Sequence, residues 1–537
     1  ASLPIVSVEE RQRARLRILR MERRQVCIVG AGISGLLACK YMLQKGFNPI
    51  VFEAKSSIGG VWSKTISTTK LQTPKPLYQF SDFPWPSSVV EDFPDHHQVL
   101  HYITAYANQF DLLKHVKFNT LVQRLHYQGP PEDEMRAWHL WGGTGQPFSP
   151  KGKWKVSVKN TLNGEIEEYV VDFVILCIGR FSDVPNIPEF PPNKGPEVFR
   201  GTVIHSKDYA AMDNQIASDY VRGKQVTVVG FQKFALDIAM ECQVVNGKRL
   251  PCTVLYRTEH WVMPDFLPWG IPLAYLYLTR FSELLVHKPG ESLLLSLIAT
   301  ILSPLKWVFS KFVETHITRK LGLRKFGMVP RHSFHQEINA CMISTVPEKF
   351  YEKVEEGSIV LKKAPSFSFC EEGIMIDGEA TPQKTDLVIL ATGYSGDKKL
   401  RDIFASPTFQ DLIVGSPGAT VPLYRECIHP EIPQLAVIGF SESATNLYTS
   451  EMRCRWVAEF LDGTFQVPSI EEMRKDIKKW DKFMKENSGE YYRRSCVAAL
   501  HVWYNDQLCK DMGWNPRRKK GFLAELFQPY GPWDYSS

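Results

Sequence analysis

The residues that could carry chemistry begin with the glycine turn at 30–35, GAGISG. An apolar run of strand length, 25–29, precedes the turn, and a segment of helix length follows it as far as Gly46. A second apolar run, 49–52, ends at Glu53. This succession of strand, glycine turn, helix, strand and acid predicts a dinucleotide-binding unit.

Each residue of this fingerprint has a physical role. Gly30 permits the tight turn, Gly32 lets the backbone approach a pyrophosphate, and Gly35 lets the helix pack closely on the strand. The helix N-terminus offers unpaired N–H groups and a partial positive charge to the phosphates. Glu53 is placed to accept hydrogen bonds from a ribose. We therefore assign Gly30, Gly32, Gly35 and Glu53 to a cofactor site.

A second, weaker glycine motif begins at Gly230, directly after another apolar run. Gln232 holds the second glycine position and Ala235 the third. The strand that follows ends in Arg257 where an NAD site would have an acid, and an arginine there suits the 2′-phosphate of NADPH. The pattern predicts an NADPH site at Gly230 and Arg257. The alternative is a retained fold that binds no nucleotide.

The composition is that of a multidomain globular protein. The chain has 537 residues, which is enough for about two to four domains. A net charge of +6 is small for this length and implies no nucleic-acid partner. The 11 cysteines include no CxxC pair, which favours reduced thiols over a disulfide framework, a zinc site or a disulfide reductase. We expect no metal.

Two motifs identify the class of enzyme more closely. The segment 59–62, GGVW, follows the acidic strand end, and residues 199–209 match all four fixed positions of FxGxxxHxxxY. In these motifs and their order, the sequence resembles the flavin-containing monooxygenases from about residue 25 onward. It resembles in particular the plant members, the group that includes the pipecolate N-hydroxylase, in segments such as EVFRGTVIHSKDY, DLVILATGY and FLAELFQPYGPWDY. The resemblance adds Gly60 and Trp62 to the FAD site and makes His205 part of an interdomain linker.

Repeated elements predict two nucleotide domains. A hairpin, an apolar strand and a terminal glycine occur at 154–179 and again at 359–393, where Thr392 and Gly393 join the cofactor-binding set. The predicted fold is α/β with two Rossmann-like domains, a discontinuous FAD domain and an inserted NADPH domain that carries a helical insertion. The predicted boundaries are a disordered basic leader at 1–24, the FAD domain at 25–205 and 346–480, the NADPH domain at 206–345 with its insertion at 265–330, and a tail at 481–537 packed on the FAD domain.

The resemblance implies a mechanism in which the cofactors do the difficult chemistry. In this family NADPH reduces FAD, O2 then gives a C4a-hydroperoxyflavin, and one oxygen passes to a soft nucleophile. The protein excludes water, holds NADP⁺ and admits the substrate, without a metal or a catalytic triad. The resemblance implies N-hydroxylation of a small amine or amino acid such as pipecolate, in plant defence.

Two glutamines depart from the family pattern. Gln72 stands where animal members carry an asparagine thought to help hold the peroxyflavin, and its amide keeps a donor, so we assign it the catalytic position. Gln232 stands at a glycine position of the NADPH loop. Both departures favour a leaky enzyme that releases hydrogen peroxide.

Other activities remain open. S-oxygenation of thioether metabolites fits the chemistry equally well, because amines and thioethers both offer a lone pair, and oxidative decarboxylation ranks third. A flavin-binding oxidase or sensor with a decayed NADPH site is a further alternative. Recognition of an amino-acid substrate would require a buried cation that binds its carboxylate. The candidates for this cation are His332, His335, Arg425 and Arg453.

Residues 265–330 allow two interpretations. The apolar run 292–303 ends before Pro304 and is shorter than the roughly 20 residues that span a bilayer. Helices that cap the active site are favoured over an interfacial membrane contact with basic flanks. The arginine-rich residues 11–24 favour a disordered leader over a targeting peptide. We predict a cytoplasmic enzyme, with peripheral contact to the endoplasmic reticulum as the alternative, and the oligomeric state stays open.

Overall fold

The apolar run Gln25–Val29 forms β1, the middle strand of a parallel sheet, in the computed structural model, which describes residues 24–497 and 500–536. Almost all of the predicted leader at 1–24 lies outside these ranges. The strands of this first sheet, in spatial order, are β18 (Leu435–Val437), β7 (Phe173–Leu176), β1, β2 (Asn48–Phe52) and β3 (Val116–Lys117). Every residue of β7 is buried, as expected for a parallel strand covered on both faces.

A second parallel sheet has the same number of strands. Its spatial order is β13 (Ile359–Lys363), β10 (Cys252–Tyr256), β9 (Val226–Val229), β17 (Leu387–Leu390) and β8 (Thr202–His205). Each glycine motif follows the middle strand of its sheet, β1 in the first and β9 in the second. The two sheets confirm the predicted α/β class with two Rossmann-like domains.

The strand pairing divides the chain differently from the predicted boundaries at 205 and 346. β8 pairs with β17, so the second sheet takes in the chain from Thr202. β13 and β17 keep the chain in that sheet until Leu390, and β18 then returns it to the first. The first copy of the hairpin, strand and glycine, at 154–179, therefore belongs to the first domain, and the second copy, at 359–393, belongs to the second. The predicted domain boundaries did not include this pairing, because neighbouring parallel strands are joined by long crossovers that sequence order does not reveal.

Smaller sheets flank the two domains. The predicted hairpin at Asn163-Gly164 joins β5 (Lys153–Asn160) to β6 (Ile166–Val171), and β4 (Thr120–Gln128) pairs with the other edge of β5. The remaining strands are β14 (Phe367–Cys370), β15 (Gly373–Ile376), β16 (Gln383–Lys384), β11 (Val262–Met263) and β12 (Ser344–Thr345).

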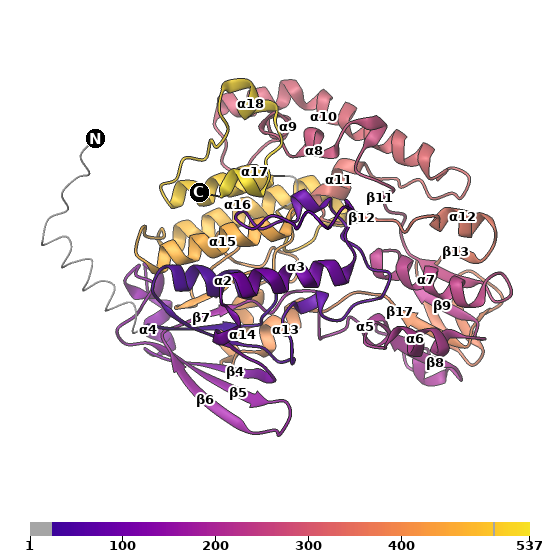
Figure 1. Ribbon diagram of the computed structural model, residues 1–537, viewed down its shortest axis with the longest axis horizontal. Helices are drawn as coiled ribbons and strands as arrows, with labels where there is room; N and C mark the ends of the chain where they lie inside the picture. Colours follow the sequence, from indigo (N-terminus) through magenta and orange to yellow (C-terminus); the bar gives the residue numbers. More distant parts are fainter. Residues whose placement is uncertain (1–23, 498–499, 537) are drawn as a thin grey trace, which may run out of the picture.

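Helices surround both sheets (Figure 1). The predicted helices after Gly35 and in 443–461 are α2 (Ile33–Gln44) and α15 (Asn446–Leu461), which pack on one another. The second motif opens α7 (Lys233–Asn246). The others are α3 (His96–Gln109), α4 (Glu132–Arg136), α5 (Ser206–Ala210), α6 (Asn214–Val221), α8 (Leu273–Tyr277), α9 (Arg280–Leu284), α10 (Leu293–Lys320), α11 (Phe334–Asn339), α12 (Phe350–Glu355), α13 (Gly396–Asp402), α14 (Pro407–Val414), α16 (Ile470–Ser488), α17 (His501–Asp511) and α18 (Phe522–Phe527).

Helix α10 corrects the expectation that Pro304 ends the apolar segment. The helix runs through Pro304, is 28 residues long in all, and is long and apolar enough, by length and composition, to cross a membrane. Only 11% of the most apolar 18-residue stretch of the helix is buried. An internal proline removes one backbone hydrogen bond. The C-terminal half is anchored in the NADPH-domain core, where Val313 and Ile317 are fully buried, and this burial offsets the loss.

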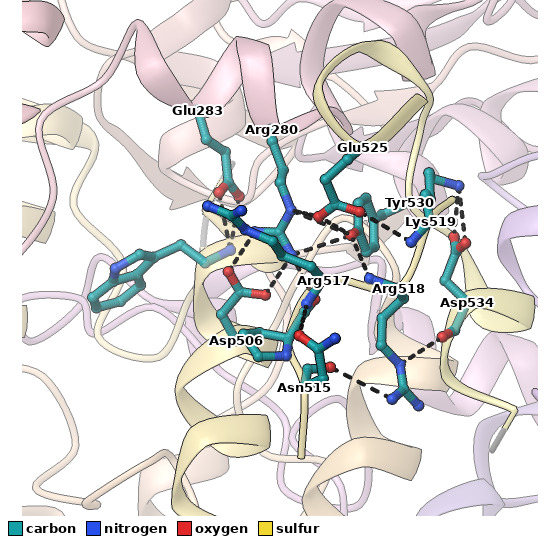
Figure 2. Close-up of polar contacts among 12 residues, drawn as sticks. Arg280, Glu283, Asp506, Asn515, Arg517, Arg518, Lys519, Glu525, Tyr530 and Asp534 are labelled. Carbon is teal, nitrogen blue, oxygen red and sulfur yellow. Dashed lines mark hydrogen bonds and ion pairs between the residues drawn. The ribbon is translucent and has the colours of Figure 1, made fainter. Parts of the chain in front are cut away.

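The C-terminal tail packs on the helical insertion as well as on the FAD domain. Figure 2 shows Arg280 of α9 surrounded by groups from the tail. Its guanidinium pairs with Asp506 of α17 at 2.5 Å, pairs with Glu525 of α18, and donates to the carbonyl of Pro516 at 2.6 Å. On the FAD side, α17 packs on α15. The predicted packing of the tail on the FAD domain is therefore only part of its contacts.

A disulfide joins Cys341 and Cys496, whose Cα atoms lie 6.1 Å apart across 155 residues of sequence. This bond corrects the expectation of fully reduced thiols. The other nine cysteines are free, and eight of these are buried. Cysteine spacing could not reveal the bond, because its two halves come together only through the packing of the tail beside α11.

Candidate active site

The carboxyl ends of both parallel sheets open into one cleft with a volume of about 1740 Å³. Its walls include loops after β1, β2, β7 and β18 of the first sheet and after β9, β10 and β17 of the second. Ligands of open α/β sheets bind at these strand ends. A single space thus connects the two predicted nucleotide sites.

The first glycine turn forms a cradle that side chains would fill. Gly30 has φ of +101°, and a Cβ there would lie 2.6 Å from the carbonyl oxygen of Cys177. A Cβ on Gly35 would lie 1.8 Å from the carbonyl oxygen of Gly30, so close packing of helix on strand requires glycine. A Cβ on Gly32 would meet only Gly60 backbone atoms, at 3.6 and 3.9 Å, and would project where a pyrophosphate must approach. These residues fit FAD.

The other predicted FAD residues surround the same turn. Glu53 is buried, and its carboxylate accepts hydrogen bonds from the backbone N–H of Ala31 at 2.7 Å and of Lys55 at 2.9 Å. It therefore holds the turn as well as facing the cleft. Gly60 and Trp62 also line the cleft, and the Trp62 indole donates to the Tyr78 hydroxyl at 2.8 Å.

Gln72 lies on the cleft wall with an exposed side chain. It belongs to the loop before the short 3₁₀ turn Lys75–Leu77. This position leaves its amide free to face a bound group, which is consistent with the assigned donor role. The catalytic assignment itself stays a prediction.

The second cradle matches NADPH in the positions that the sequence singled out. Gly230 has φ of +134°, and a Cβ there would lie 2.5 Å from the carbonyl oxygen of Ala391. Ala235 is fully buried at the third glycine position, and its Cβ would lie 3.5 Å from a Cβ on Gly230. Arg257 is exposed on the cleft wall directly after β10, as a 2′-phosphate ligand must be.

Gln232 is accommodated in the second turn without closing it. It is the N-cap residue of α7, and its side-chain amide points to the carbonyl oxygen of Met342, at 3.5 Å. One turn further along α7, burial raises the pKa of the Asp237 carboxyl to about 6, although Lys233 lies 2.6 Å away and opposes the shift. Gln232 and the backbone of this turn remain part of the cleft wall.

Thr392 and Gly393 line the cleft at the junction between the domains. The Thr392 hydroxyl donates to the carbonyl of Asn186 at 2.5 Å, and the N–H of Asn186 donates to the carbonyl of Gly393 at 2.9 Å. His205 Nε2 lies 3.0 Å from that same carbonyl oxygen, and burial lowers the pKa of this imidazole. His205 therefore fastens the linker, as the motif implied.

The predicted candidates for a buried substrate cation lie elsewhere. His332, His335, Arg425 and Arg453 are described by the structure but do not line the cleft. Arg425 is paired with Asp511 at 2.7 Å, and Arg453 donates to the Tyr504 hydroxyl at 2.8 Å.

Two arginines that sequence reasoning missed do line the cleft, Arg180 and Arg493. Both contact Glu442 Oε1, at 3.4 and 3.1 Å. Burial raises the pKa of the Glu442 carboxyl, while Arg493 and Arg180 oppose the rise. No motif marked these residues, although Arg180 directly follows the terminal glycine of the β7 segment.

A second cluster joins two imidazoles through one acid. His260 Nδ1 lies 3.1 Å from one oxygen of Glu337, and His332 Nε2 contacts the other. Burial would raise the pKa of Glu337, but the two histidines outweigh it and lower the pKa. The ligand atoms lie within 4.8 Å of one another. Each carboxylate oxygen already has an imidazole partner, so the arrangement is that of a hydrogen-bonded chain.

Two Rossmann-like domains whose cradles open into one cleft define a flavoprotein that also binds a nicotinamide dinucleotide. A family model described as FMO-like, flavin-binding monooxygenase-like, matches residues 23–525. The chain belongs to this family, and it is a flavin-containing monooxygenase that uses FAD and NADP(H).

Similar proteins agree with this assignment. The chain is 41% identical to a probable flavin-containing monooxygenase 1 of Arabidopsis thaliana over 95% of this chain and 96% of the relative. It is 26% identical to flavin-containing monooxygenase 3 of Canis lupus familiaris over 95% of this chain and 88% of the relative. Among solved structures, cyclohexanone monooxygenase superposes with a TM-score of 0.62 at 16% identity, covering 91% of this chain and 97% of the other, and thus shares its fold.

Proposed function

We propose that the enzyme N-hydroxylates a small amine or amino acid such as pipecolate. The observation that carries the proposal is the single cleft into which both dinucleotide cradles open, because a small substrate there can reach both cofactors. The resemblance of 199–209 and of the C-terminal segment to the plant members, a group that includes a pipecolate N-hydroxylase, supports this substrate class. A role in plant defence stays a prediction that rests on the same resemblance.

The bound FAD and NADPH supply the reducing equivalents and activate O2. The chain holds FAD at the first glycine turn and Glu53, and NADPH at Gly230 and Arg257. Helix α8 supplies Leu273, Ala274 and Tyr277 to the cleft wall, so part of the insertion caps the site and excludes water.

The test uses the purified holoenzyme with NADPH and isotopically labelled O2. Pipecolate and an amino acid that carries a thioether are offered separately, and products are identified by mass spectrometry. We expect one labelled oxygen on the nitrogen of pipecolate, with NADPH consumed in proportion. Labelled sulfoxide without any N-hydroxylated product would overturn the proposal in favour of S-oxygenation. NADPH consumption that yields only hydrogen peroxide would favour the oxidase interpretation.

We also propose that the enzyme is cytoplasmic and rests on a bilayer surface through α10. Large apolar side chains are exposed along the helix between Leu293 and Val308, among them Leu294, Leu297, Ile301 and Trp307. Leu267, Trp269, Ile271 and Tyr275 are exposed nearby in sequence. Arg319, Lys320 and Arg324 follow at its C-terminal end. An exposed apolar face with aromatic and basic edges suits an anionic lipid surface.

Flotation with lipid vesicles tests this contact. The protein should bind vesicles that contain anionic lipid, and a variant with Leu294, Leu297, Ile301 and Trp307 changed to serine should stay in solution. Leu162→Ser, at a side chain that is 78% exposed in the β5–β6 hairpin, is the matched control. Equal flotation of all three proteins would contradict the proposal.

A further inference from the structure

The cleft-lining cluster of Arg180, Glu442 and Arg493 lies at one end of the cofactor site. Arg180 comes after β7 and Glu442 after β18, which are neighbouring strands of the first sheet. Glu53, the acid predicted to bind a ribose, comes after β2 on the other side of β1. FAD bound with its pyrophosphate at the β1 turn and its ribose at Glu53 would leave the side of the cleft beside β7 and β18 for the rest of the molecule. The cluster lies on this side of the cleft, on the wall that a substrate beside the cofactors would meet.

The cluster carries a net positive charge. Both guanidinium groups contact the same oxygen of Glu442, so one carboxylate serves two cations. The exposed fractions of the side chains are 15% for Arg180, 15% for Glu442 and 28% for Arg493. A surplus cation at a partly dehydrated cleft wall attracts an anion more strongly than a surface arginine does.

The two guanidinium groups are held in place by neutral partners. Arg180 donates to the carbonyl of Ser495 at 3.1 Å, and Arg493 donates to the carbonyl of Cys341 at 2.8 Å. The Phe181 ring centroid lies 5.9 Å from the Arg180 guanidinium carbon and 5.8 Å from that of Arg493. These contacts fix the planar groups while leaving each with donors that are not spent on Glu442. The site is therefore preorganised for a small planar anion, and a carboxylate matches guanidinium geometry.

We infer that Arg493 and Arg180 bind the carboxylate of a small amino-acid substrate, with Glu442 balancing their charge. The inference rests on the proposed function and specifies its substrate class as one that keeps a free carboxylate. If the cluster only held the tail against the FAD domain, it would need neither an excess positive charge nor a position on the cleft wall. The amine or thioether of the substrate then lies a few bonds from the anchored carboxylate, and the aromatic wall at Phe181 contacts its apolar part.

Binding calorimetry on the FAD-loaded protein tests this without relying on turnover. Pipecolate is compared with piperidine, which has the same ring without the carboxylate. We expect Arg493→Gln and Arg180→Gln each to weaken pipecolate binding by about tenfold to a hundredfold, the loss of one charge-assisted hydrogen-bond pair. Piperidine should bind all proteins alike. Arg493→Lys should recover part of the affinity, and Arg331→Gln, at an exposed position outside the cleft, is the matched control.

The outcomes separate the inference from the proposed function. Unchanged pipecolate affinity in both glutamine variants would overturn the carboxylate site, even if pipecolate is N-hydroxylated. Equal loss of pipecolate and piperidine binding would also overturn it, since it would indicate a damaged cleft. Carboxylate-dependent binding without N-hydroxylated product would support the site and refute the N-hydroxylase proposal. Failure of the wild-type protein to bind pipecolate would overturn both.

Discussion

Gly32 and Gly35 belong to the same turn but require glycine for different reasons. A Cβ on Gly35 would collide with the carbonyl oxygen of Gly30 at 1.8 Å, whereas a Cβ on Gly32 meets its nearest atom at 3.6 Å. Gly32 also has φ of −74°, which alanine adopts freely. The folded protein itself therefore tolerates a methyl group at position 32, and the approach of a pyrophosphate does not.

Gly32→Ala should accordingly separate folding from cofactor binding. We expect a folded protein that retains less than about a tenth of the wild-type FAD content, because the methyl group fills the pyrophosphate approach. Circular dichroism and flavin absorbance measure the two properties. Gly35→Ala should lose both, and a Gly32→Ala protein that holds FAD normally would place the pyrophosphate elsewhere.

Arg257 should determine the preference for NADPH over NADH. Its guanidinium is exposed on the cleft wall, and a charge-assisted contact with the 2′-phosphate is lost in Arg257→Gln. We expect KM for NADPH to rise by about tenfold to a hundredfold while KM for NADH changes little. Steady-state kinetics with each nucleotide measure this. Arg249→Gln, exposed and outside the cleft, is the control, and a parallel rise for NADH would show that Arg257 does not contact the 2′-phosphate.

At the level of elements, α9 is the point where the insertion and the tail hold each other. Figure 2 shows Arg280 between Asp506 and Glu525. The side chain of Arg280 is 18% exposed, and those of Asp506 and Glu525 are 11% and 12% exposed. Glu283, one turn later, accepts from the backbone N–H of Val502 at 2.9 Å. The same insertion places α8 on the cleft wall. The tail therefore supports the cap of the active site indirectly, through its contacts with α9.

Arg280→Met should therefore be strongly destabilising. The change leaves two poorly hydrated carboxylates without their cation, which costs about 3–5 kcal/mol of unfolding free energy. Urea unfolding followed by tryptophan fluorescence measures the loss. Lys475→Met removes an exposed pair within α16 and should leave the midpoint unchanged. A comparable shift in both variants would mean that Arg280 contributes no more than a surface pair.

For the whole molecule, the Cys341–Cys496 bond connects the part of the cleft wall beyond α11 to the tail. The loop it closes is long, so the bond restricts the unfolded chain considerably. We expect Cys496→Ser to lower the free energy of unfolding by about 2–4 kcal/mol. A reductant should lower the wild-type value to the same level and leave the variant unaffected.

Thiol counting gives an independent readout of that bond. Alkylation of the denatured, unreduced protein should modify nine cysteines and leave two protected. Modification of all 11 cysteines, together with stability that does not respond to reductant, would show that the thiols stay reduced in solution.

Local patterns in the sequence determined both nucleotide cradles. Gly30, Gly35 and Gly230 are specified by backbone geometry, and Glu53 and Arg257 follow at a fixed distance because a strand and a helix of ordinary length separate them. The family assignment follows from the same motifs. The hairpin at Asn163-Gly164 was also predictable, since its signal is contained in adjacent residues.

Tertiary structure alone decided the features that join distant segments. The second sheet recruits β8 and β17 from either side of the predicted domain boundary, because parallel pairing depends on crossovers and not on sequence order. Helix α10 passes Pro304 because burial of its C-terminal half outweighs a lost hydrogen bond. The charged cluster on the cleft wall unites Arg180, Glu442 and Arg493 from three separate segments, and no local period encodes such a contact.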